Sequence, residues 1–155
     1  MIKRERIPNA LFKKILKNVP RPTADLLVTV WQEGEKYFLL GKRGDKPYRG
    51  KWFIPGGSVF WGESPPAAAT RQLKRELGIV TEVGEADFLF VYSFVFPPNN
   101  TGVRYHSLMH VYKIVIPDRT VVRPNKENTS IGWFSAIDPR WPKPLKDILR
   151  RAGFK

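Results

Sequence analysis

The residues best suited to chemistry lie between positions 57 and 79, in the segment GSVFWGESPPAAATRQLKRELGI. A turn that contains glycine leads into a predicted helix, which carries Arg71, Arg75 and Glu76 in its second half. Mg²⁺ prefers oxygen ligands and is usually shared between carboxylates and phosphate groups. Cations stabilise negative charge on a departing phosphate, and glycine lets the backbone approach a ligand. The segment therefore favours metal-assisted chemistry on a phosphorylated substrate.

Hydrophobic patterning predicts the elements that must position this segment. Ser64 can cap a helix over residues 64–77, because Pro65 suits the first turn and Gly78 follows the end. Apolar residues with β-branched or aromatic side chains predict strands at 25–31, 36–41, 88–96, 107–116 and 131–134, the first two forming a hairpin. Further helices are expected after Pro8 and at 144–151. The fold class is α/β (α+β), a mixed sheet with at least two helices against it.

Composition narrows the classes of function. At 155 residues without cysteine, the chain predicts one domain spanning residues 1–155, held by packing rather than by disulfides. The net charge of +13 attracts polyanions, so a phosphorylated small molecule, nucleic acid and an anionic membrane surface all fit. The basic residues are spread along the chain, which makes nucleic acid a less favoured partner. No signal peptide and no membrane-spanning segment are predicted, so a cytoplasmic, soluble protein is expected.

The segment 57–79 resembles the signature of the Nudix hydrolases. The positions that match this signature are Gly57, Glu63, Arg71, Leu73, Glu76, Gly78 and Ile79. The resemblance implies the Nudix fold, a mixed sheet sandwiched between helices with a loop–helix–loop active site. It further implies that Glu76 is a Mg²⁺ ligand and that Glu63 and Arg71 form a structural pair between loop and helix.

Two departures from the Nudix signature point to a subfamily. Gln72 and Arg75 stand where most members have glutamate, a difference shared with the GDP-mannose mannosyl hydrolases. Residues 38–43, 50–57 and 124–134 also resemble that subfamily. The resemblance implies Mg²⁺-dependent hydrolysis of a nucleoside diphosphate sugar, with GDP-mannose as the expected substrate and a homodimer as the expected assembly. The missing glutamates argue against an ordinary site with several metal ions.

The subfamily resemblance assigns site residues position by position. It implies that Mg²⁺ is held by the carbonyl of Gly56 and by the carboxylates of Glu76 and Glu127. Arg43 is expected to contact the diphosphate and to help the nucleotide leave, and Asp25 is expected to assist catalysis beside the sugar. Phe12 corresponds to an apolar residue near the base, although packing in the core is the favoured role.

The catalytic base does not follow the subfamily pattern. Asn128 stands in place of the expected histidine, Ser58 in place of an arginine and Phe94 in place of a second histidine. Glu127 could instead activate water for attack at phosphorus. The histidines at 106 and 110 share one face of a predicted strand and are alternative bases, or polar residues on a wet face.

Three functional hypotheses remain open from the sequence. The first is hydrolysis of a nucleotide sugar, and the second is cleavage at phosphorus of another nucleoside diphosphate derivative, such as ADP-ribose or a dinucleotide. The third is a relative without turnover that binds nucleotides or nucleic acid, which the net charge of +13 favours mildly. Trp61, inside the signature loop, is the aromatic residue most expected to face a ligand.

Overall fold

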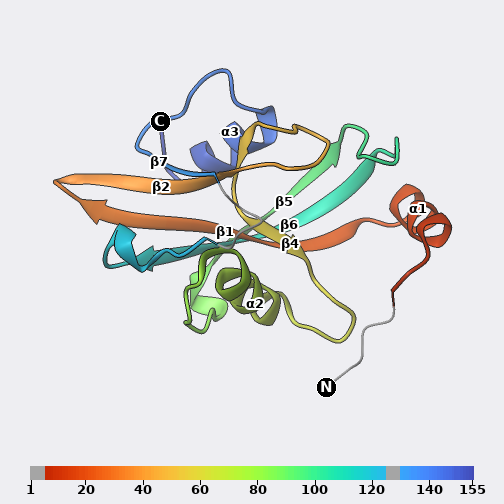
Figure 1. The fold of residues 1–155 in the computed structure, drawn as a ribbon, viewed down its shortest axis with the longest axis horizontal. Helices are drawn as coiled ribbons and strands as arrows, with labels where there is room; N and C mark the ends of the chain where they lie inside the picture. The colour runs from red at the N-terminus through yellow and green to blue at the C-terminus, as the bar shows by residue number, and fades with distance from the viewer. Residues whose placement is uncertain (1–5, 125–129) are drawn as a thin grey trace.

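The computed structural model describes residues 6–124 and 130–155. Four β-strands follow a short N-terminal helix, and a second helix separates them from the later strands (Figure 1). In chain order the elements are α1 (Asn9–Asn18), β1 (Arg21–Gln32), β2 (Glu35–Lys42), β3 (Trp52–Phe53), β4 (Gly56–Ser58), α2 (Pro65–Leu77), the 3₁₀ turn η1 (Glu85–Asp87), β5 (Phe88–Phe96), β6 (Tyr105–Ile116), the 3₁₀ turn η2 (Arg119–Val121), β7 (Ile131–Phe134) and α3 (Lys143–Arg151).

The seven described strands form one mixed sheet, as the sequence predicts. Its main order is β3-β2-β1-β6-β5, with β4 paired to β1 and β7 paired to β2. The pairing of β1 with β6 is parallel, and the other strand pairs are antiparallel. The predicted hairpin is confirmed, because residues 29–32 pair with residues 35–38.

Residues 52–58 lie between β1 and β2, beyond the part in which these two strands pair as a hairpin. We call this place the wedge. β3 pairs with residues 41–42 of β2, while β4 pairs with residues 23–25 of β1. The amide of Leu26 also donates to the carbonyl of Pro55 at 2.8 Å. A short glycine-rich segment is thereby held by main-chain bonds between two long central strands, and this places Gly56 directly opposite Asp25.

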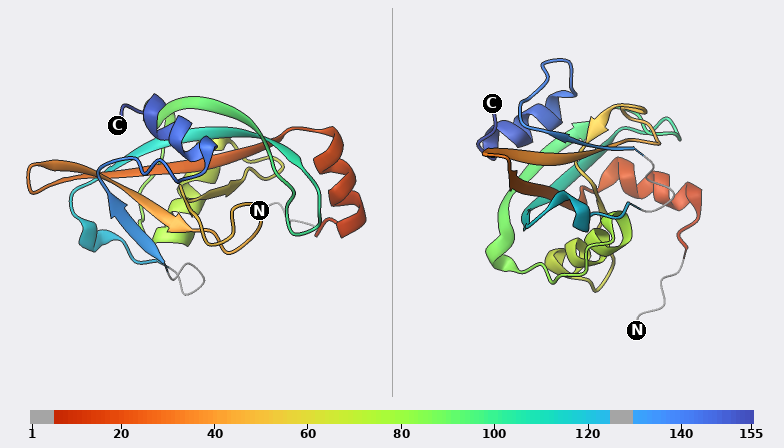
Figure 2. Two further views of the ribbon diagram at one scale, coloured as in Figure 1. Left: turned by 90° about the horizontal axis from the view of Figure 1, so that it is seen from above. Right: turned by 60° about the vertical axis from the view of Figure 1, so that its left-hand side comes forward.

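Helices cover both faces of the sheet, because successive side chains of a strand point to opposite faces. Leu26 and Leu39 pack with Leu73 of α2 on one face. Leu27 and Leu40 belong to a second cluster with the buried residues of α3. Figures 1 and 2 show α2 and α3 on opposite sides of the sheet, so the predicted sandwich is confirmed.

The ends of α2 follow from its sequence. The hydroxyl of Ser64 accepts a hydrogen bond from the amide of Ala67 at 3.3 Å, and Pro65 begins the helix. Gly78 ends it with φ of 66°, in the left-handed region where glycine carries no Cβ penalty. The predicted helix over residues 64–77 is thus confirmed together with both of its end signals.

β1 begins at Arg21 rather than at the predicted Asp25. The extra residues pair in parallel with β6, with Arg21 opposite Ser107 and Thr23 opposite Met109. This part of the strand buries Thr23 and Asp25, so its sequence lacks the apolar alternation that marks an ordinary strand. Two prolines nearby further hide its extent, since proline suits the first residues of a strand but weakens the pattern.

Among the described residues, no helix combines the length and the apolar composition that crossing a membrane requires.

Leu73→Ala should lower the free energy of unfolding by about 2–5 kcal/mol, because Leu73 is fully buried between α2 and the sheet. Leu11→Ala is the matched control, since Leu11 on α1 is 50% exposed, and it should cost less than about 1 kcal/mol. Urea unfolding followed by fluorescence would measure both. Equal losses for the two variants would contradict the assigned core.

Candidate active site

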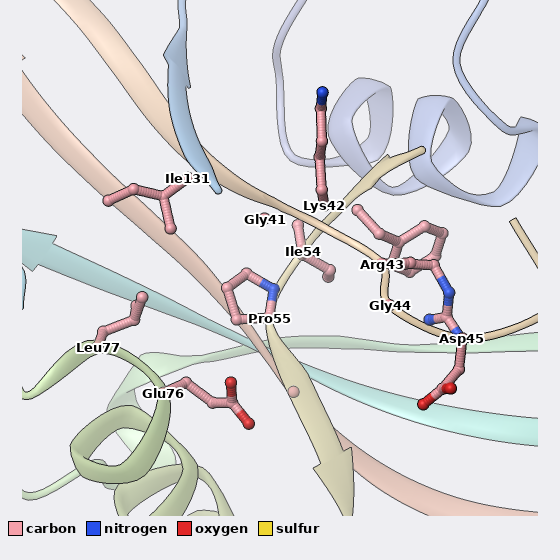
Figure 3. Close-up of a pocket in the computed structure, with 12 residues that line it drawn as sticks. Gly41, Lys42, Arg43, Gly44, Asp45, Ile54, Pro55, Glu76, Leu77 and Ile131 are labelled. Carbon is pink, nitrogen blue, oxygen red and sulfur yellow. The ribbon is translucent and has the colours of Figure 1, made fainter. Parts of the chain in front are cut away.

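A cavity of about 200 Å³ opens at the wedge between β1 and β2. We call it the Glu76 cavity. Its walls come from the end of β2, from β3 and β4, from the last turn of α2 and from the start of β7; the lining residues are Gly41, Lys42, Arg43, Gly44, Asp45, Phe53, Ile54, Pro55, Gly56, Glu76, Leu77 and Ile131. Figure 3 shows Glu76 on one side of this cavity and Arg43 with Asp45 on the other. A carboxylate and a guanidinium thus face a common space.

Glu76 and Gly56 are the two described members of the predicted metal site, and both line the Glu76 cavity. The carboxylate of Glu76 is nearly buried, with the residue 7% exposed, and it forms an ion pair with Arg75 at 3.2 Å. Glu127 and Asn128 lie outside the described residues. Within residues 6–124 and 130–155, no three His, Cys, Asp or Glu side chains gather as a metal cluster.

The described donors fit a hard cation. Glu76 offers carboxylate oxygens and the Gly56 backbone offers a carbonyl, which are ligand types that Mg²⁺ prefers. The guanidinium of Arg75 lies beside Glu76 and brings positive charge, rather than a further carboxylate, to this end of α2. This arrangement fits a single divalent cation better than a cluster of several.

Glu63 and Arg71 form the predicted structural pair. Arg71 donates from Nε and Nη2 to the two carboxylate oxygens of Glu63, at 2.8 and 2.9 Å. Arg71 also donates to the carbonyl of Ser58 at 2.9 Å, and its guanidinium lies 3.8 Å from the ring centre of Phe60. A bidentate pair of this kind fixes geometry as well as charge, so it holds the loop before α2 against that helix.

Gln72 packs its neutral side chain against Gly57 of β4. The residue is 3% exposed, and a Cβ added at Gly57 would lie 2.2 Å from the amide nitrogen of Gln72. A larger residue at position 57 would therefore require the Gln72 side chain to move. A neutral amide at 72 can lie this close to the main chain without the cost of burying another charge.

Asp25 lies in an adjoining cavity of about 80 Å³, which we call the Asp25 cavity. The two cavities share four residues, Arg43, Phe53, Ile54 and Gly56. Asp25 is 6% exposed, and its carboxylate accepts a hydrogen bond from the hydroxyl of Thr23 at 2.5 Å. The structure thus brings the predicted residues Asp25, Arg43 and Gly56 together.

Burial raises the pKa of Asp25 to about 7. Desolvation disfavours the charged carboxylate, and this outweighs the hydrogen bond from Thr23 and the attraction of Arg21 and Arg43, which lower the pKa. Perturbed pKa values of this size are common at functional sites. Asp25 can therefore gain or lose a proton near neutral pH.

Arg43 is held where the two cavities meet. Its Nε donates to the carbonyl of Pro47 at 2.7 Å, and its guanidinium lies 5.6 Å from the ring centre of Phe53. The loop that follows Arg43 is tied to the β5–β6 connection by Asn100, which accepts from the amide of Lys46 at 3.0 Å. These contacts orient the guanidinium, which also has a side-chain hydrogen bond with Tyr105.

The remaining predicted residues lie away from both cavities. Phe12 is partly buried and packs against the core cluster on the α3 side of the sheet, in agreement with the packing role. Trp61 is 85% exposed and lines neither cavity, so its expected ligand contact has no support.

The two histidines do share one face of β6, as predicted, and they line neither cavity. His106 contacts the hydroxyl of Ser93 at 2.8 Å, and His110 contacts the carbonyl of Thr23 at 3.1 Å. Side chains of the opposite face of β6, including Tyr105 and Ser107, line the Asp25 cavity instead.

The sequence alone did not point to several polar residues of the Asp25 cavity, among them Arg21, Tyr105 and Ser107. Arg21 stands between two prolines, and neither of the others belongs to a spaced motif. Their one sequence signal is strand alternation. Residues 21, 23 and 25 share a face of β1, and residues 105 and 107 share a face of β6.

Comparison with known proteins decides the family. The model of the NUDIX domain matches residues 20–152. The chain belongs to the Nudix family. A structure of a MutT protein from Methanosarcina mazei Go1 is similar to this Nudix fold, with a TM-score of 0.63 and 24% identity over 86% of this chain and 94% of that one.

Two curated relatives match parts of this Nudix protein. The low-salt glycan biosynthesis protein Agl8 of Haloferax volcanii is 40% identical over 74 residues, which are 48% of this chain and 45% of the relative. An ADP-ribose pyrophosphatase of Methanocaldococcus jannaschii is 38% identical over 61 residues, which are 39% of this chain and 35% of the relative. The matched regions therefore span less than half of the curated relatives.

The stability of the metal-free protein should depend on Asp25 between about pH 4 and pH 7. Because the folded pKa of about 7 exceeds the ordinary value of 3.8, the folded state binds the proton more tightly, and stability is lost as pH rises through this window. Asp25→Asn should remove the loss, which is on the order of 4 kcal/mol at about 1.4 kcal/mol per pKa unit. Parallel stability curves for the wild-type protein and Asp25→Asn over this range would contradict the assignment.

Proposed function

We propose that this Nudix hydrolase cleaves a nucleoside diphosphate sugar in a Mg²⁺-dependent reaction, with GDP-mannose as the first substrate to test. The observation that carries the proposal is the junction of two cavities. Glu76 and Gly56 line one cavity, Asp25 lines the other, and Arg43 borders both. Such a junction suits a diphosphate with a sugar attached, because a cation and a guanidinium can both stabilise the charge of the diphosphate beside the adjoining polar cavity.

The proposal gives a role to each predicted site residue. Gly56 and Glu76 would hold Mg²⁺ together with Glu127, and the bound ion would neutralise charge on the diphosphate. Arg43 would donate hydrogen bonds to the departing diphosphate and stabilise its negative charge. Asp25 would lie beside the sugar and assist catalysis there. Phe12 packs against the core and is not among the proposed substrate contacts, so it would act only through packing.

The position of attack follows from which group activates water. Neither histidine lines the Glu76 cavity or the Asp25 cavity, and Asn128 cannot accept a proton as an imidazole does, so no described imidazole replaces the base expected for attack at the sugar carbon. Glu127 is a carboxylate in the corresponding loop and would activate water for attack at phosphorus. The products would then be a mononucleotide and a sugar phosphate.

A second candidate is hydrolysis of a different nucleoside diphosphate derivative such as ADP-ribose. The Methanocaldococcus jannaschii relative is an ADP-ribose pyrophosphatase, and the matched region covers 35% of it. The same cation site and the same Arg43 would serve that substrate. A module that binds nucleotide without turnover is disfavoured, because Gly56 and Glu76 face one cavity together. The single domain and the homodimer stay predictions.

Incubation with GDP-mannose, Mg²⁺ and ¹⁸O-labelled water tests the proposal. Mass spectrometry should find label in GMP or in mannose 1-phosphate if water attacks phosphorus, and in free mannose if it attacks carbon. Glu76→Gln should lower the rate at least about 100-fold, whereas Glu82→Gln, at an exposed position outside both cavities, should leave it unchanged.

Absence of turnover on GDP-mannose, together with turnover on ADP-ribose, would favour the second candidate. Absence of turnover on both would contradict the enzymatic proposal.

A further inference from the structure

Arg21 has no evident structural purpose in the Asp25 cavity. It lines this cavity from the start of β1, on the same strand face as Thr23 and Asp25. Its Nε is shielded from solvent and has no hydrogen-bond partner among the described residues. Its guanidinium lies 5.6 Å from the ring centre of Tyr105 on β6, a contact that orients the group but does not neutralise it.

The charges of this cavity are unbalanced. Arg21 and Arg43 both line it, and burial together with the charge of Arg43 lowers the pKa of Arg21. Asp25 is the one carboxylate among the lining residues, and its hydrogen bond comes from Thr23. Among the described residues, neither arginine lies within ion-pair distance of it. Two guanidinium groups therefore face one carboxylate that another side chain already engages.

We propose that Arg21 and Arg43 together bind a negatively charged group of the substrate in the Asp25 cavity. The apolar walls formed by Phe53 and Phe96 strengthen such an interaction, because they keep water from screening it. The hydroxyls of Ser107 and Tyr105, which also line the cavity, can donate to the same anion. An arginine held in place before the anion arrives costs little reorganisation when it binds.

Two parts of a nucleoside diphosphate sugar can supply this anion. One is the phosphate nearest the sugar, which Arg43 also borders from the Glu76 cavity. The other is a carboxylate on the sugar itself, as in a hexuronic acid. The inference rests on the proposed function, since both sources are parts of its substrate class.

The test compares two substrates that differ by one group, GDP-mannose and the GDP derivative of the matching hexuronic acid. The kcat/KM of the wild-type protein, Arg21→Gln and Arg21→Lys is measured on each. Arg140→Gln is the control, because it removes the same charge from an exposed arginine that lines neither cavity. Thermal unfolding midpoints of the metal-free variants are measured alongside.

Arg21→Gln should lower kcat/KM about tenfold or more, and Arg21→Lys should recover part of the loss. The unfolding midpoint of Arg21→Gln should be equal to or above that of the wild-type protein, because this substitution removes a desolvated charge. An equal loss on both substrates assigns the anion to the phosphate. A larger loss on the hexuronic acid derivative assigns it to the carboxylate.

Two outcomes would overturn the inference. One is a kcat/KM for Arg21→Gln within twofold of the wild-type value on both substrates. The other is a lowered unfolding midpoint with no recovery in Arg21→Lys, which would make Arg21 a structural residue. If the wild-type protein cleaves neither substrate, the proposed function fails instead. Binding of inorganic pyrophosphate then decides the inference, which requires weaker binding by Arg21→Gln and falls if the two proteins bind equally.

Discussion

The close approach of the Gly56 backbone to β1 is the constraint on which the rest of the site depends. A Cβ at this position would lie 2.5 Å from a carboxylate oxygen of Asp25 and 2.6 Å from the carbonyl of Ala24. Because glycine has no Cβ, β4 can pair with β1 at the wedge. The pairing puts the proposed metal-binding backbone of Gly56 next to Asp25 on one side and to the cavity of Glu76 on the other. Any larger residue at 56 would force these groups apart.

The parts of the site are stabilised by different interactions according to their task. The Glu63–Arg71 pair satisfies both of its charges with bidentate hydrogen bonds and fixes the loop before α2. Asp25 and Arg21, in contrast, are desolvated and do not form an ion pair with each other. This arrangement lowers the stability of the free protein. Strain of this kind is typical of residues whose partner is a ligand. A protein of net charge +13 would bring an anionic substrate towards such a site.

Much of this could be predicted from the sequence, because its signals are local. The α2 helix has a capping serine, an early proline and a terminal glycine, and the spacing from Gly57 to Glu76 predicts the residues of the proposed metal site. The start of β1 could not be predicted, since Thr23 and Asp25 are polar and buried, and their strand is identified only by pairing with β6. Arg21 and Tyr105 were missed for the same reason. They are 84 residues apart in the chain, and only the parallel pairing of two strands makes them neighbours.

We propose that Glu76 holds a single divalent cation at the wedge, with the guanidinium of Arg75 beside it. Titration of the metal-free protein with Mn²⁺, followed by electron paramagnetic resonance in the presence of a nucleoside diphosphate, measures the ion directly. We expect one ion per chain, and binding weakened by at least about tenfold in Glu76→Gln but not in Glu82→Gln. Unchanged affinity in Glu76→Gln, or two ions per chain in the wild-type protein, would contradict it.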